Sequence, residues 1–86
     1  MHVPASNPAQ RAWAVTPSDT LPVSYGVSGV SFARGVLASG PCLVRVTTLG
    51  GDIVTLPFQA GYNPVSITQV WNSGTSLGGY SLFGLY

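Results

Sequence analysis

Few side chains in this sequence could carry out chemistry. The chain has one histidine (His2), one cysteine (Cys42) and two acidic residues (Asp19 and Asp52), and it has neither lysine nor glutamate. Nucleophilic catalysis needs a nucleophile, a base and a group that orients the base. His2 lies in an N-terminal stretch without periodicity, so Cys42 has no imidazole partner in the body of the chain. We interpret Cys42 as a small buried residue or a simple free thiol, and we expect that the protein is not an enzyme.

The other possible sites are weaker still. Asp52 follows a glycine pair, where an aspartate commonly binds local backbone amides, so a turn role is favoured over a catalytic pair with Asp19. One histidine, one cysteine and two aspartates, none at a ligand spacing, do not make a closed metal site within one chain. Residues 74–79 are rich in glycine but lack the lysine and spacing of a phosphate loop. Three scattered arginines do not form the basic stripe that binds nucleic acid. We therefore expect no cofactor, no metal and no nucleic-acid partner.

Arginines and aromatic residues remain as candidates for binding. Arg34 and Arg45 lie in apolar strand surroundings, where a guanidinium either extends to solvent or takes a carboxylate, carbonyl or aromatic partner. Aromatic rings such as that of Trp71 suit a sugar platform or a protein interface, although most aromatic residues of a small β-domain belong to its core. The interface residues that the sequence predicts are Trp13, Arg34, Arg45, Tyr62, Trp71, Tyr80 and Tyr86.

The centre of the chain predicts a β-hairpin that would position several of these residues. Two runs rich in β-branched residues, 43–48 and 52–56, flank a glycine-containing turn and are bounded by prolines. Alternation places Val44 and Val46 together on an aliphatic face and Arg45 on the opposite, mixed face.

Short strands are also predicted on both sides of the hairpin. The motif Thr16-Pro17-Ser18-Asp19 matches a helix cap, but Pro22 stops a helix within about one turn, so we expect a turn or a single 3₁₀ turn. The apolar C-terminal strand is expected to be paired inside the sheet. The predicted strands span residues 12–15, 23–32 with a bulge at 28–29, 34–38, 65–71 and 80–86, with a connection over 58–64 and turn residues over 72–79. Five to seven short strands predict an all-β fold, a small antiparallel barrel or sandwich.

The chain divides into an irregular N-terminal arm, residues 1–11, and a single β-domain, residues 12–86. Only 6% of its residues are charged and its net charge is +1, whereas a typical domain has about 25% charged residues. A small soluble monomer normally carries a net charge of about 2–8. We therefore expect that an assembly covers part of the surface; the alternative is a neutral domain without a partner. No secretory signal and no membrane-spanning run is recognisable, so we expect assembly in a cytoplasm and no membrane partner.

Several short motifs follow one another between residues 14 and 86. They are the TPSDT start within 14–20, the segment 32–40, the GGD hairpin at 49–56, the proline-led strand 63–71, the turn 73–75 and the terminal Leu85-Tyr86. Their order resembles that of the small head spike base proteins of tailed phages and of phage-derived gene transfer agents. The sequence departs from that pattern in the turn after the proline-led strand, in additional residues over 23–31 and in a longer leading arm.

The resemblance implies a virion structural protein on the head surface, assembled in the host bacterial cytoplasm. It implies a homo-oligomeric ring, a pentamer favoured over a trimer, that contacts the major capsid protein at a vertex and anchors a spike or fibre protein. A capsid decoration protein or tail-associated protein of the same fold is an alternative. A carbohydrate-binding or receptor-binding module that uses Trp71 and the tyrosines is another.

Overall fold

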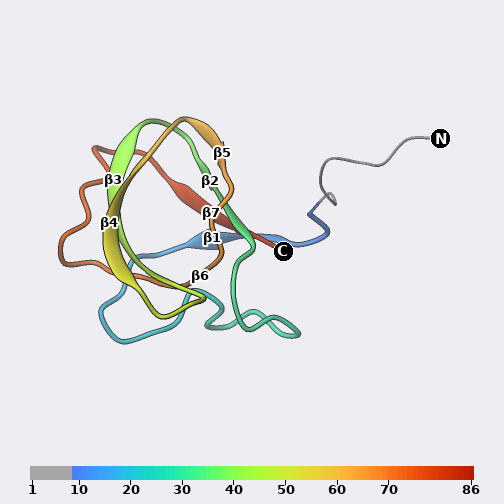
Figure 1. Ribbon diagram of the computed structural model, residues 1–86. Helices are drawn as coiled ribbons and strands as arrows, with labels where there is room; N and C mark the ends of the chain where they lie inside the picture. Colours follow the sequence, from blue (N-terminus) through green and yellow to red (C-terminus); the bar gives the residue numbers. More distant parts are fainter. Residues whose placement is uncertain (1–8) are drawn as a thin grey trace.

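Seven short antiparallel strands form the protein, and the computed structural model describes residues 9–86 (Figure 1). The strands are β1 (Ala12–Val15), β2 (Gly35–Ala38), β3 (Cys42–Thr48), β4 (Ile53–Phe58), β5 (Gly61–Asn63), β6 (Ile67–Val70) and β7 (Leu82–Leu85). No helix occurs among the described residues. The predicted all-β fold is confirmed. Its two sheets do not close into a barrel, so the fold is sandwich-like.

The first sheet, sheet A, has the strand order β1-β7-β2-β5. β7 is antiparallel to both β1 and β2, so that Gly84 pairs with Trp13 on one side and with Val36 on the other. The C-terminal strand thus lies inside the sheet, as the sequence predicts. Burial inside a sheet satisfies the backbone groups of this apolar segment, which would otherwise form an exposed edge.

The second sheet, sheet B, has the order β4-β3-β6 and contains the predicted hairpin. The turn is closed by two bonds, from Thr48 N–H to Asp52 O at 2.8 Å and from Gly51 N–H to Thr48 O at 2.9 Å. Gly51 has φ +96°, which a residue without Cβ adopts readily. The hairpin is confirmed, but Pro57 lies within β4 and does not bound it. β4 is an edge strand, where proline is tolerated.

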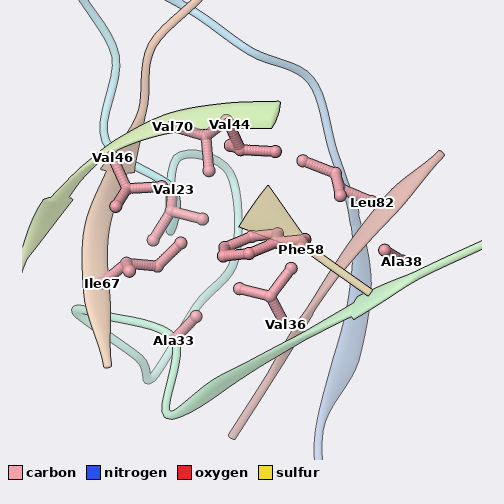
Figure 2. Close-up of a cluster of buried hydrophobic side chains, with 10 residues drawn as sticks. All are labelled: Val23, Ala33, Val36, Ala38, Val44, Val46, Phe58, Ile67, Val70 and Leu82. Carbon is pink, nitrogen blue, oxygen red and sulfur yellow. The ribbon is translucent and has the colours of Figure 1, made fainter. Parts of the chain in front are cut away.

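The core lies between the two sheets, whose inner side chains point toward one another (Figure 2). The predicted aliphatic face of the hairpin is confirmed, because Val44 and Val46 are fully buried. Phe58 lies between the inner side chains of both sheets. The buried apolar residues are Val23, Ala33, Val36, Ala38, Val44, Val46, Phe58, Ile67, Val70 and Leu82.

Two sequence predictions about strands are wrong. Residues 23–32 form successive turns and no strand, with Val27 N–H donating to Ser24 O, and with Gly26 and Gly29 at positive φ. Small polar residues and glycines between apolar residues imitate strand alternation, but here they serve turn geometry. The predicted connection 58–64 contains the short strand β5, which pairs with β2.

The segments that flank the strands are held by specific bonds. Ser18 Oγ accepts from the N–H groups of Thr20 and Leu21, which gives the predicted turn in place of a helix. Within the predicted arm, residues 1–8 lie outside the described residues. Gln10 and Arg11 donate backbone N–H groups to Tyr86 O and so join the start of the described chain to its end.

Candidate interaction surfaces

The outer face of sheet A is apolar across all four strands. Strand alternation sends Val36, Ala38 and Leu82 inward, and it sends Leu37, Phe83 and Leu85 outward. Leu37 pairs with Tyr62 of β5, and these two side chains are 39% and 48% exposed. We call this surface the sheet-A face; its residues are Ala12, Ala14, Gly35, Leu37, Tyr62, Phe83 and Leu85. Apolar residues on both faces are typical of a sheet that has protein packed against both faces.

Aromatic rings of the predicted interface set lie directly on glycines. The ring of Tyr62 covers Gly35 so closely that a Cβ there would overlap it, and Tyr80 covers Gly40 in the same way. On the inner side of sheet A, Trp13 lies over Gly84, where a Cβ would come within 2.6 Å of the indole. Each of these three positions needs glycine, because a side chain there would displace the aromatic ring that lies over it.

Trp13, which the sequence predicts as an interface residue, anchors the N-terminal strand to the rest of the domain. Its indole Nε1–H donates to Val23 O at 3.0 Å, and its ring packs against the buried core. The bond ties β1 to the start of the turn region 23–32, ten residues further along the chain. The contacts of Trp13 within the described residues are therefore those of an internal packing residue.

A second apolar surface lies on the β3–β4 hairpin. Leu43, Leu49 and Ile53 are each at least half exposed, and Val54 is 39% exposed. We call these four residues the hairpin patch. Leu43 and Ile53 point to the outer side of sheet B, opposite to the buried Val46, and share that side with Arg45. Val54 points to the inner side at the edge of the core, and Leu49 lies in the turn. The hairpin thus exposes large apolar side chains on both of its sides, and scattered exposed residues of this kind are ordinary on a protein surface.

The hairpin also has an open edge, because β4 has β3 as its only strand neighbour among the described residues. Hydrogen-bonded and non-hydrogen-bonded pairs alternate along an antiparallel ladder. Thr48 and Asp52 form a hydrogen-bonded pair at the turn, so the backbone groups of Ile53 and Thr55 point away from β3. Pro57 falls in the same phase, where its missing N–H removes no ladder bond. The edge can therefore accept another strand beside Ile53 and Thr55.

Both predicted arginines stack on aromatic rings. The guanidinium carbon of Arg45 lies 5.0 Å from the centroid of Trp71, and that of Arg34 lies 4.8 Å from the centroid of Tyr86. Trp71 also donates its Nε1–H to Thr47 Oγ1 at 2.9 Å. Arg45 is half-buried, whereas Arg34 is exposed. The mixed face of the hairpin thus holds an internal cation–π pair, and its part in an interface remains a prediction.

The two aspartates both serve turns, as predicted. Asp19 Oδ1 accepts from the backbone N–H groups of Asn72 and Ser73 and from Ser73 Oγ, at 2.9–3.1 Å. The backbone bond from Ser73 is the main reason that the pKa of Asp19 is lowered from 3.8. Asp52 donates its N–H to Thr48 Oγ1 within the hairpin turn. These contacts give neither aspartate a catalytic role.

Cys42 is half-buried at the start of β3 and packs against the core. Burial raises the pKa of its thiol above 9.0, which disfavours the reactive thiolate. His2 lies outside the described residues. Within residues 9–86 no group of three or more His, Cys, Asp or Glu side chains is placed to hold a metal ion.

A cleft of about 340 Å³ runs between β1 and the loop that follows it. Its lining includes Val15, Pro17, Leu21, Val23 and Tyr25, and it contains no carboxylate, histidine, cysteine or cationic side chain. Most of the side chains that line the cleft are apolar, and the phenol of Tyr25 is its one side chain that titrates. The described part of the chain also has no helix of the length and apolarity needed to cross a membrane.

Comparison with models of protein families, with curated proteins and with solved structures gives no match for this chain.

The sequence prediction named the aromatic residues but missed most of the sheet-A face. Leu37, Phe83 and Leu85 were not among the predicted interface residues, although their strands carry a signal. The segments 35–38 and 82–85 are apolar at nearly every position and do not alternate with polar residues. Such runs are typical of strands that are buried on both faces.

Proposed function

We propose that this protein is a virion structural protein, a head spike base that assembles as a ring on a capsid vertex and anchors a spike or fibre. The observation that carries the proposal is the extent of apolar surface on a chain with so few charges. The sheet-A face, the hairpin patch and the open edge of β4 all present uncharged groups to solvent. A free monomer is poorly served by such a surface, whereas a particle subunit covers it.

The positions of the motifs support the proposal in a second way. The TPSDT start and the turn 73–75 are more than fifty residues apart, yet Asp19 binds the backbone of Asn72 and Ser73. The GGD motif closes the β3–β4 hairpin through Gly51 and Asp52. The motifs on which the resemblance rests therefore hold the frame of the domain. Such structural motifs are expected in a protein that acts through its surfaces.

The direct test is to locate the protein in particles. Purified particles from the source should contain the chain by mass spectrometry, and a density map should show it as a ring at the head vertices beneath a spike. Density elsewhere on the head or on the tail would favour the decoration or tail-associated alternative. Absence from purified particles, with the protein present in the cell lysate, would overturn the virion assignment altogether.

A further inference from the structure

We propose that the open edge of β1 binds an extended segment of another protein, which adds to sheet A as a further strand and places an apolar side chain in the cleft beside β1. The proposal names a binding site and a class of partner that the proposed function does not. Strand addition takes its affinity from backbone hydrogen bonds and its specificity from pockets for alternate side chains.

The first argument is that β1 presents free backbone groups along its outer edge. Arg11 and Tyr86 exchange two backbone bonds, of 2.9 and 3.0 Å, which fix the phase of the β1–β7 ladder. Ala12 and Ala14 fall in the opposite phase, so their N–H and C=O groups point away from β7. Within residues 9–86 these groups have no hydrogen-bond partner. They recur at every second residue, which is the spacing that another extended chain matches.

The other sheet edges of the described chain are covered or protected. Backbone bonds from Ser18, Val23 and Ala33 cover β6, and β5 has only three residues. β4 contains Pro57, in the phase that faces away from β3. Proteins commonly protect an open edge with proline, with charge or by keeping the strand very short. β1 contains neither proline nor charge, and Arg11 prolongs its pairing with β7.

The second argument is the cleft, which lies directly beside this edge. Ala14 and Val15 line it together with Leu21 and Val23 of the following loop. Trp13 donates to Val23 O at 3.0 Å, but no backbone bond joins β1 to that part of the loop within the described residues. The loop therefore borders the edge without pairing with it.

Alternation determines which side chain of the added strand enters the cleft. Trp13 and Val15 point to the inner side of sheet A, so the side chains directly opposite them point inward too. The side chain opposite Val15 falls at the cleft. The cleft holds about 340 Å³, whereas ligand pockets hold roughly 300–1,000 Å³. Its size thus suits a side chain better than a larger ligand.

The third argument is charge. No charged side chain lines the cleft, so the entering side chain is expected to be apolar. Arg11 lies four residues before Val15, on the same side of the strand, and is exposed. Its guanidinium donates one bond, to Ser28 O at 3.0 Å, and has further N–H groups for a carboxylate. An antiparallel segment with an apolar residue opposite Val15 therefore has an acidic residue opposite Arg11, four positions later.

This spacing indicates that the segment belongs to another protein. The chain itself has an apolar residue followed four positions later by an acidic one only at Val15 and Asp19. Val15 already belongs to β1, and the carboxylate of Asp19 binds the backbone of Asn72 and Ser73. A second copy of the chain therefore offers no free segment of this kind.

The test measures binding of a fluorescent, end-capped synthetic peptide by anisotropy. The peptide has isoleucine followed four positions later by aspartate, with threonine and serine elsewhere. It should bind the wild type saturably. Ala14→Pro removes an outward N–H without removing a ladder bond, and should weaken binding roughly tenfold. Thr55→Pro makes the same change on the open edge of β4 and should leave binding unchanged. A peptide with asparagine in place of aspartate should bind a few-fold more weakly to the wild type and equally to Arg11→Gln.

Circular dichroism and thermal unfolding establish that each variant is folded. If Ala14→Pro does not fold, Leu21→Asp replaces it, because it places a charge in the lining of the cleft. Leu49→Asp in the hairpin turn is its control, since both leucines are exposed and only Leu21 lines the cleft. Leu21→Asp should weaken binding, and Leu49→Asp should not.

Other results overturn the inference. No saturable binding up to millimolar peptide, or an equal loss in a variant and its control, shows that β1 is not the site. A peptide with the reversed order that binds as tightly contradicts the antiparallel pairing with Arg11. A wild-type dimer that Ala14→Pro converts to a monomer shows that the occupant is a second copy. The proposed virion role is judged separately by whether the protein is present in particles.

Discussion

Replacing Val46 with threonine tests where the core lies on the hairpin. Val46 of β3 pairs directly with Val54 of β4, and both side chains point to the inner side of sheet B. Val46 is 0% exposed, whereas Val54 is 39% exposed. Threonine has nearly the shape of valine, so the substitution changes polarity with little change in volume. We expect Val46→Thr to destabilise the domain and Val54→Thr to leave it nearly unchanged.

The magnitude follows from the burial of the two positions. A hydroxyl group buried without a partner costs about 1–3 kcal/mol. A chain of this size has a free energy of unfolding of about 4–13 kcal/mol, and 1 kcal/mol shifts Tm by about 4–8 °C. Val46→Thr should therefore lower Tm by roughly 4–24 °C. The hydroxyl of Val54→Thr can bind water, so its effect should stay within about 0.5 kcal/mol, or about 4 °C.

Thermal and urea unfolding, followed by circular dichroism at concentrations where the protein is monomeric, measure both variants. Equal losses at Val46 and Val54 would show that the inner side of β4 is covered. A neutral Val46→Thr would refute the assignment of the core to this side of the hairpin. Val46→Asp extends the series, because an unpaired buried charge costs several kcal/mol and should leave the domain unfolded or insoluble. A soluble, folded Val46→Asp would contradict the same assignment.

Three further predictions concern single side chains. The backbone bond from Ser73 is the main reason that the pKa of Asp19 is lower in the folded state than 3.8. The ionised carboxylate therefore stabilises the fold above pH 3.8, and this stabilisation is lost as the pH falls through the pKa of the folded state. The difference in Tm between wild type and Asp19→Asn should become smaller over that pH range. Arg45→Gln should remove about 0.5–2 kcal/mol and alter the fluorescence of Trp71, whereas lost assembly with unchanged stability would place Arg45 in an interface. The raised thiol pKa of Cys42 predicts slower labelling by a disulfide reagent than for a model thiol at neutral pH, with a rate that rises with pH above 9.0; full reactivity at neutral pH would contradict it.

The hairpin could be predicted from the sequence because its signals are local. A turn of five residues, Thr48 to Asp52, contains the glycine that must adopt positive φ, and the strands beside it are rich in β-branched residues. Strand β1 and the paired C-terminal strand were also predictable. In each of these segments, propensity, pattern and turn chemistry favour the same structure.

The segment 23–32 could not be predicted because its local signals conflict with its tertiary role. Val23 is buried and Trp13 binds its carbonyl, so the segment begins as a cap on the core and then turns outward. Gly26 and Gly29 both adopt positive φ, which no strand position requires. The alternation of valine with serine in this segment is a by-product of those turns. Alternation of apolar and polar residues does not by itself distinguish a strand from a series of successive turns.

The aromatic candidates show why a surface is harder to predict than a strand. The ring of Tyr62 lies over Gly35 of the neighbouring strand, a contact that depends on the register between β2 and β5. Register joins residues far apart in the chain, so composition alone cannot supply it. Once the register is known, the apolar runs of β2 and β7 indicate an apolar surface as well as a core. One side of each strand fills the core, and the other side forms the apolar sheet-A face.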